Sequence, residues 1–273
     1  MAKIEIGVLV PLVESPEEEM RKVADLGLRS CQVCAWDPAL YTPGVGQALV
    51  DAAKRHQVTI TTLWSGYPGR MVWNFLEGPS TIGLVPPATR ALRVEALQKA
   101  ARFAASIPLA SITTHVGFIP SDPNDPLFAG TLEAIRQVLD VCLAGGIEFW
   151  FETGQETPVT LLRTIQRLGG KGLGINLDTA NLILYGNGNP VDALDVFGRY
   201  VRGTHAKDGR FPTNGDSLGS EVPIGQGKVD WPTVIAKLKA LGYRGALTIE
   251  REISGPQQIK DIQAAIEYLG KLV

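Results

Sequence analysis

Short β-like runs alternate with longer amphipathic stretches along the whole chain, and this alternation constrains the fold more than any other feature. Runs rich in β-branched and aromatic residues predict eight strands: Ile4–Val10, Ser30–Trp36, Val58–Trp64, Ser111–Val116, Ile147–Glu152, Leu173–Asp178, Val201–Ala206 and Ala246–Glu250. The stretches between and after them predict eight helices: Glu17–Leu26, Gln47–His56, Ala88–Ser106, Leu127–Ala144, Val159–Leu168, Ala193–Tyr200, Trp231–Leu241 and Gln257–Leu269.

Because a helix separates each strand from the next, neighbouring strands should run parallel. Eight such units form a (β/α)8 TIM barrel, an α/β fold that pairs every strand and leaves no sheet edge. A doubly wound open sheet is the alternative, but residues 10–16 lack the Gly-x-Gly-x-x-Gly pattern of dinucleotide-binding turns. No linker or charge run divides the chain, so we expect one barrel domain over residues 1–273.

Charge and hydropathy argue against nucleic acids and membranes as binding partners. The chain has 26 basic and 28 acidic residues, and no run of Lys and Arg exceeds two, which argues against nucleic-acid binding. No apolar run approaches the roughly 18 residues of a membrane span. We therefore expect a cytoplasmic protein that acts on a small molecule.

Two connections are too long to be simple turns. They cover residues 65–87 and 208–229, and both follow predicted strands. Loops of this length in a barrel usually form lids or site walls, and loops after strands lie at the C-terminal face, where barrel enzymes place their active sites.

Four successive strands carry a polar side chain at their last inward-facing position. Strand residues alternate between the barrel interior and the helices, so apolar Phe151 places its neighbour Glu152 inward. The same alternation directs Asp178, His205 and Glu250 inward at the ends of the next three strands. The sequence therefore predicts that these four side chains meet in the barrel mouth.

Three carboxylates in one mouth would repel one another unless a positive charge neutralises them. A divalent cation would do so, and a set of carboxylates with one imidazole suits Mn²⁺, Mg²⁺, Co²⁺ or Zn²⁺, with Mn²⁺ our first expectation. An ordinary buried ion pair is the alternative for any one of these residues taken alone. Four at matching strand ends favour a metal centre.

The sequences around these residues resemble a known family. The segments Phe151-Glu-Thr-Gly-Gln, Leu177-Asp-Thr-Ala-Asn, Gly203-Thr-His-Ala-Lys-Asp and Thr248-Ile-Glu-Arg-Glu are similar to the xylose-isomerase-like TIM barrel superfamily, in particular its sugar phosphate isomerase/epimerase members. The resemblance extends over the chain and includes Pro223-Ile-Gly-Gln-Gly-Lys-Val-Asp. It implies that the four residues bind one metal and that Glu152 and Glu250 form the acid/base pair.

The function that this resemblance implies is a sugar isomerase or epimerase, similar to the ketose 3-epimerases. One glutamate would remove the proton next to a carbonyl, the metal would stabilise the enediolate, and the other glutamate would work from the opposite face. A lyase that dehydrates a keto-sugar or inosose with the same metal site is the alternative. An apurinic-site endonuclease fits poorly because the chain has only three histidines.

The chain departs from related epimerases at one position. They carry histidine three residues after the strand-six aspartate, where this chain has Asn181, which hydrogen-bonds a hydroxyl but does not bind metal as imidazole does. The departure leaves the substrate open. We expect Asn181 to contact it.

Further substrate contacts are expected around the mouth. His115 ends strand four with inward parity, as in many superfamily members, and Lys207 shares the parity of His205, although a solvated lysine is an equal alternative. Arg210 lies near an arginine that binds substrate in some epimerases, whereas Trp36 and Trp64 would form an apolar wall or simply pack in the core. We expect an uncharged sugar as substrate, and the relatives suggest a dimer or tetramer.

Overall fold

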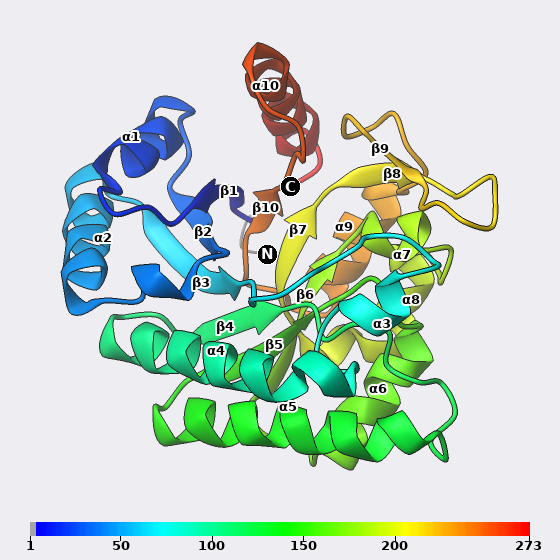
Figure 1. Ribbon diagram of the computed structural model, residues 1–273. Helices are drawn as coiled ribbons and strands as arrows, with labels where there is room; N and C mark the ends of the chain where they lie inside the picture. Colours follow the sequence, from blue (N-terminus) through cyan, green and yellow to red (C-terminus); the bar gives the residue numbers. More distant parts are fainter. Residues whose placement is uncertain (1–3) are drawn as a thin grey trace.

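The computed structural model describes residues 4–273 and shows a closed barrel of parallel strands (Figure 1). The order around the barrel is β1-β10-β7-β6-β5-β4-β3-β2, which closes the sheet as predicted. The barrel strands are β1 (Ile6–Pro11), β2 (Ser30–Ala35), β3 (Thr59–Ser65), β4 (Ser111–Thr114), β5 (Glu148–Glu152), β6 (Leu173–Asp178), β7 (Val201–Ala206) and β10 (Leu247–Ile249).

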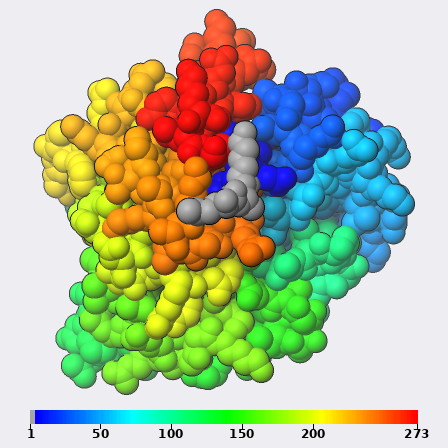
Figure 2. All heavy atoms as spheres, turned by 180° about the vertical axis from the view of Figure 1, so that it is seen from behind, coloured from blue at the N-terminus to red at the C-terminus, as the bar shows by residue number. Residues whose placement is uncertain are grey.

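Helices between the strands form the outer layer. They are α1 (Glu17–Asp25), α2 (Pro43–His56), α4 (Pro87–Ser106), α5 (Pro126–Ala144), α6 (Pro158–Arg167), α8 (Pro190–Phe197), α9 (Trp231–Ala240) and α10 (Pro256–Gly270). Seen from behind, the colours follow the sequence around the molecule from blue through green to red, so consecutive units are neighbours (Figure 2). None of the helices within residues 4–273 has the length and apolar character that a membrane span requires.

Local sequence explains where several of these helices begin. Thr42, Asp125, Thr157 and Asn189 each precede a proline at the first helical position, and each accepts a hydrogen bond from a backbone N–H of the first turn. The side chain satisfies an N–H that has no partner within the helix, and proline has the φ angle that a first helical residue needs. These four helices begin at their prolines, one to four residues before the predicted starts.

The core lies between the barrel and the helices. Phe149 and Phe151 on β5, like Ile175 and Leu177 on β6, are at most 1% exposed and face the helical layer. The residues between them point into the barrel, as the alternation predicted. Because both faces of each strand are covered, the inward polar residues are also buried.

The two long connections are more ordered than predicted. The first contains a short helix, α3 (Gly78–Thr81), and passes in front of the barrel (Figure 1). The second contains the antiparallel pair β8 (Asp208–Arg210) and β9 (Ser220–Val222). The remaining short elements are α7 (Asn181–Leu184), η1 (Pro38–Leu40) and η2 (Gly198–Tyr200). The predicted helix over residues 193–200 is therefore two elements, α8 and η2.

Two buried charged side chains hold these connections. Arg93 on α4 donates hydrogen bonds to carbonyls of the first connection, at residues 68, 70, 81 and 83, and lies 4.6 Å from the ring centroid of Tyr67. Asp208 accepts from four backbone N–H groups, at residues 209, 225, 227 and 229, and from the indole N–H of Trp231. These two side chains therefore supply hydrogen-bond partners to backbone carbonyl and N–H groups that a loop would otherwise leave unpaired.

Candidate metal centre and its cavity

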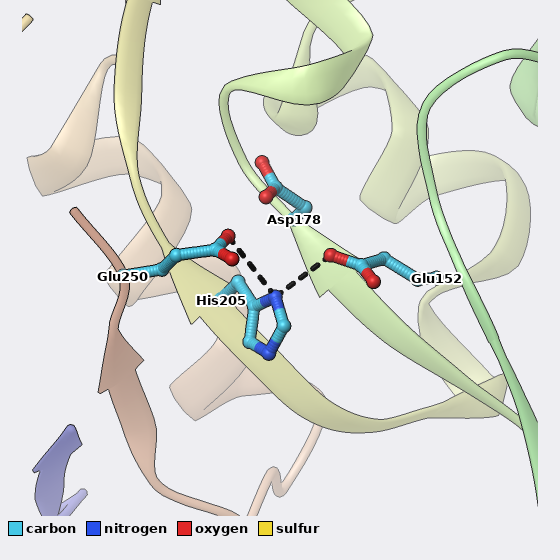
Figure 3. Close-up of side chains that lie close together, drawn as sticks. All are labelled: Glu152, Asp178, His205 and Glu250. Carbon is cyan, nitrogen blue, oxygen red and sulfur yellow. Dashed lines mark hydrogen bonds and ion pairs between the residues drawn. The ribbon is translucent and has the colours of Figure 1, made fainter. Parts of the chain in front are cut away.

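The four predicted strand-end residues meet at one end of the barrel. Strand register explains why: Asp178 on β6 pairs with His205 on β7, and His205 pairs with Thr248 on β10, two residues before Glu250. Glu152 ends the neighbouring strand β5. Figure 3 shows the carboxylates of Glu152 and Glu250 pointing toward the His205 ring, with Asp178 close by, and one ligand atom from each of the four residues lies within 4.8 Å of the others.

Glu152 and Glu250 flank the same nitrogen of His205. Its Nδ1 lies 2.7 Å from Glu152 Oε1 and 3.2 Å from Glu250 Oε2. The other oxygen of Glu152 accepts a hydrogen bond from the indole N–H of Trp64 and lies 3.4 Å from Nε2 of His115. Glu152 is therefore held from both sides, whereas Glu250 is partly open to the cavity.

The two oxygens of Asp178 have different surroundings. Oδ1 accepts hydrogen bonds from the backbone N–H groups of Ala180 and Asn181, at 2.8 and 2.7 Å, and so caps the start of α7. Oδ2 is buried and has no hydrogen-bond partner. The ammonium group of Lys207 lies 3.2 Å away without forming a hydrogen bond, so a bound cation would complete the surroundings of this buried oxygen.

Lys207 is buried beneath the same cluster. Its side chain is 1% exposed, and Nζ lies 3.2 Å from Asp178 Oδ2, 3.1 Å from Glu250 Oε2 and 2.9 Å from Glu252 Oε1. A solvated lysine, one of the two alternatives from the sequence, is therefore wrong. The ammonium group neutralises part of the acidic cluster from the side of β7 and β10.

Burial and pairing shift the pKa of every group in the cluster. Burial alone would lower the pKa of His205, but the two glutamates raise it well above its usual value. Burial would raise the pKa of Glu152 and Glu250, but the neighbouring cations hold both below the usual range. Burial raises the pKa of Asp178 to about 8 despite the opposing charge of Lys207. Asp178 is therefore the carboxyl that holds a proton at neutral pH.

The donor set fits a divalent cation. Three carboxylates and one imidazole, without cysteine, are typical of Mn²⁺, Mg²⁺ or a catalytic Zn²⁺ rather than a structural zinc site. Asp178 Oδ2 accepts no hydrogen bond and shares only an ion pair with Lys207, so it is available as a ligand for a cation. Within residues 4–273, this is the one group of such side chains close enough to hold a metal.

A cavity of about 390 Å³ opens above the four residues. One wall is aromatic: the rings of Trp36 and Trp64 lie 4.7 Å apart, and Trp73 lies 6.5 Å from Trp36. His115 packs against this wall, with its ring centroid 5.3 Å from that of Trp73 and 6.1 Å from that of Trp64, and Asn181 and Tyr185 add polar groups to the lining. The other lining residues are Cys34, Glu152, Leu184, Leu218, Glu250 and Glu252.

Most of the predicted substrate contacts surround this cavity, and one does not. Trp36, Trp64, His115 and Asn181 line it, and burial lowers the pKa of His115 despite the nearby carboxylates. Lys207 lies below the lining. Arg210 is exposed on β8 and does not contribute to the wall, so the structure places it apart from the other five.

Sequence reasoning missed several residues around the centre. Gln32 on β2 is 1% exposed and hydrogen-bonds His205; its inward parity with Cys34 was a signal that could have found it. Tyr185 comes from a segment without strand periodicity, so no pattern marked it, whereas Trp73 lies in the connection over residues 65–87 that was predicted to form a lid or site wall. Glu156 is buried just after β5, and burial raises its pKa to about 8.

Comparison with a solved structure supports this architecture at high similarity. A xylose isomerase domain protein from Planctomyces limnophilus shares 34% sequence identity with this chain and superposes with a TM-score of 0.92. The match covers 99% of this chain and 98% of that protein.

More distant structures share the fold. A D-tagatose 3-epimerase-like protein is 22% identical, with a TM-score of 0.74 over 98% of both chains. A xylose isomerase-like TIM barrel protein from Mycobacterium smegmatis, solved in complex with magnesium, is 15% identical, with a TM-score of 0.71 over 99% of this chain and 96% of that one. At these identities the likeness concerns the fold. The model of the family described as "Xylose isomerase-like TIM barrel" matches residues 20–272, and the chain belongs to that family.

Proposed function

We propose that the protein is a metal-dependent sugar isomerase or epimerase. The observation that carries the proposal is the convergence of Glu152, Asp178, His205 and Glu250, two of which, Glu152 and Glu250, line a cavity with an aromatic wall. The family and the epimerase-like structural relative agree with this class of reaction. The four residues are the proposed ligands of one divalent cation, with Mn²⁺ and Mg²⁺ as the first candidates, and a magnesium-bound relative supports the latter.

When bound, the cation would supply Lewis-acid polarisation of a substrate carbonyl and so acidify the neighbouring C–H. Glu152 and Glu250 are the proposed acid/base pair because they flank the centre from two sides and both carry a lowered pKa. One carboxylate takes the proton from the carbon beside the carbonyl, which leaves an enediolate. The other glutamate, which its lowered pKa leaves ionised, must first take a proton from solvent, and it then gives that proton to the opposite face of the carbon and inverts it.

The cavity favours an uncharged sugar. No Arg or Lys contributes to the described lining, and the ammonium group of Lys207 is already surrounded by the carboxyl groups of Asp178, Glu250 and Glu252. A phosphate group would therefore find no free cation at the wall. Trp36 and Trp64 offer apolar faces to the C–H side of a sugar ring, and Asn181 and Tyr185 offer hydrogen-bonding groups to its hydroxyls.

The test is exchange of substrate carbon-bound hydrogen with solvent. Ketoses, keto-sugars and inosose are incubated with enzyme and Mn²⁺ in deuterated water, and deuterium incorporation is followed by NMR and mass spectrometry. Glu152→Gln and Glu250→Gln should lose exchange. Glu148→Gln is the matched control because Glu148 starts the same strand at the far end of the barrel.

Three outcomes separate the alternatives. An epimer of unchanged mass supports the proposal, whereas a product lighter by one water would assign a dehydratase to the same site. Normal exchange in either active-site variant would contradict the roles of the two glutamates.

A further inference from the structure

A chain of polar side chains crosses the barrel interior beneath the candidate metal centre. Gln32 extends from β2 to the opposite side of the barrel, where Oε1 lies 2.9 Å from His205 Nε2 and Nε2 donates to Asn176 Oδ1 at 2.9 Å. All three side chains are at most 1% exposed. A buried amide requires partners at both ends, and Gln32 finds them on β6 and β7.

The surroundings fix which way the Gln32 amide faces. Its Nε2 also lies 3.5 Å from the backbone carbonyl oxygen of Thr204, which only accepts hydrogen bonds. The carbonyl end of the amide therefore faces His205, and Nε2 of the imidazole carries the hydrogen of that bond. The tautomer that results leaves Nδ1 as the nitrogen for a cation, on the side of Glu152 and Glu250.

The strand that carries His205 makes room for this arrangement. A Cβ atom at Gly203 would lie 2.5 Å from Asn176 Oδ1 and 3.4 Å from Gln32 Nε2, so a side chain there would displace the hydrogen-bonded pair. Asn176 Nδ2 has no partner. The pair is therefore held by its bonds to His205 and Thr204 and not by a wider polar network.

We propose that Gln32, held in orientation by Asn176, is a positioning residue of the metal centre. It would fix both the tautomer and the ring plane of His205 and so present Nδ1 to the divalent cation. Hydrogen-bond partners of this kind typically contribute a factor of about 10 to 100 in metal affinity. The inference rests on the proposed metal-dependent function and assigns a role to residues outside the ligand set.

The experiment measures Co²⁺ binding by calorimetry and by the visible spectrum of the bound ion. Gln32→Met keeps the length of the side chain but removes both hydrogen bonds, and it should weaken Co²⁺ binding about 10- to 100-fold and alter the spectrum. Gln32→Glu keeps an acceptor for His205 Nε2, with Asn176 free to turn its amide toward the new carboxylate. It should retain at least wild-type affinity and the wild-type spectrum.

Ser30→Ala is the matched control. Ser30 lies on the same strand, two residues earlier, and its buried hydroxyl has no partner, so its removal should change neither affinity nor spectrum. Asn176→Leu leaves Gln32 in place but frees its amide to turn, and it should also weaken binding. This variant keeps the proposal testable if Gln32→Met does not fold.

The outcomes distinguish this proposal from the one on which it rests. If the wild-type protein binds no Co²⁺, the metal centre itself is wrong. If the wild type binds and Gln32→Met matches it in affinity and spectrum, the positioning role is wrong. Equal weakening by Gln32→Met and Gln32→Glu would also overturn it, because packing and not the hydrogen bond would then be responsible.

Discussion

Metal binding at neutral pH should release about two protons from this protein, because the charges of the cluster balance in both states. Without metal, the cations of His205 and Lys207 match the anions of Glu152 and Glu250, and Asp178 is protonated since burial raises its pKa to about 8. With a divalent cation bound, the three negative charges of the carboxylates match the two positive charges of the ion and the one of the Lys207 ammonium group. One proton leaves Asp178 and one leaves His205.

The size of the pH dependence follows from this count. Each released proton makes the binding constant rise about tenfold per pH unit while that proton is still held by the free protein. Two protons give about 100-fold per unit at pH values below the raised pKa of Asp178. The slope should decrease once that carboxyl ionises in the metal-free protein, near pH 8.

Calorimetric titration with Mn²⁺ in buffers of different ionisation enthalpy measures the proton count directly. Asp178→Asn, which has no carboxyl proton to release, should bind more weakly and reduce the count to about one. A count near zero for the wild type would refute the charge balance, since the ligands would then be deprotonated before the metal arrives.

Three further variants test other parts of the molecule. Burial raises the pKa of Glu156 to about 8, so the folded wild type holds a proton that the unfolded chain loses, and its stability should fall by up to about 1.4 kcal/mol per unit between pH 5 and 8. In urea denaturation, the stability of Glu156→Gln should not show this fall with pH, and identical pH slopes for the variant and the wild type would contradict the prediction. Asp208→Ala leaves buried N–H donors unpaired and should cost about 3 kcal/mol, whereas a loss below about 1 kcal/mol in thermal denaturation would show that water replaces the carboxylate. If the half-exposed ring of Trp36 forms the substrate wall proposed above, Trp36→Ala should raise KM with little change in kcat, and a selective loss of kcat would be inconsistent with that role.

The convergence of the four strand-end residues could be predicted because it depends on strand alternation alone. Inward parity identified all four residues, and parallel register then places Asp178 beside His205 without knowledge of any loop. Glu250 lies one residue beyond β10, yet its backbone N–H still bonds the carbonyl of Ala206 at 3.1 Å, which continues the strand geometry. The predicted strand ended at Glu250 and the observed one ends at Ile249, but this difference does not change the position of the Glu250 side chain.

The remaining site residues depend on contacts that no local pattern records. Lys207 is buried only because carboxylates from β6 and from beyond β10 surround its ammonium group. Trp73 reaches the cavity on a connection whose backbone is held by Arg93, a residue of the following helix. Sequence periodicity reports which face of an element is buried, but these two placements depend on distant segments.

Asn181 illustrates how one position separates metal binding from substrate recognition. Its backbone N–H donates to Asp178 Oδ1, which orients that carboxylate, and this bond does not depend on the side chain. The side chain itself lines the cavity, close to Gly154. Exchange of histidine for asparagine at this position therefore leaves the cap of α7 and the ligand set intact and replaces a titratable ring by a neutral amide. The difference from related epimerases at this position therefore bears on the substrate and on the type of reaction, and not on the four proposed ligands.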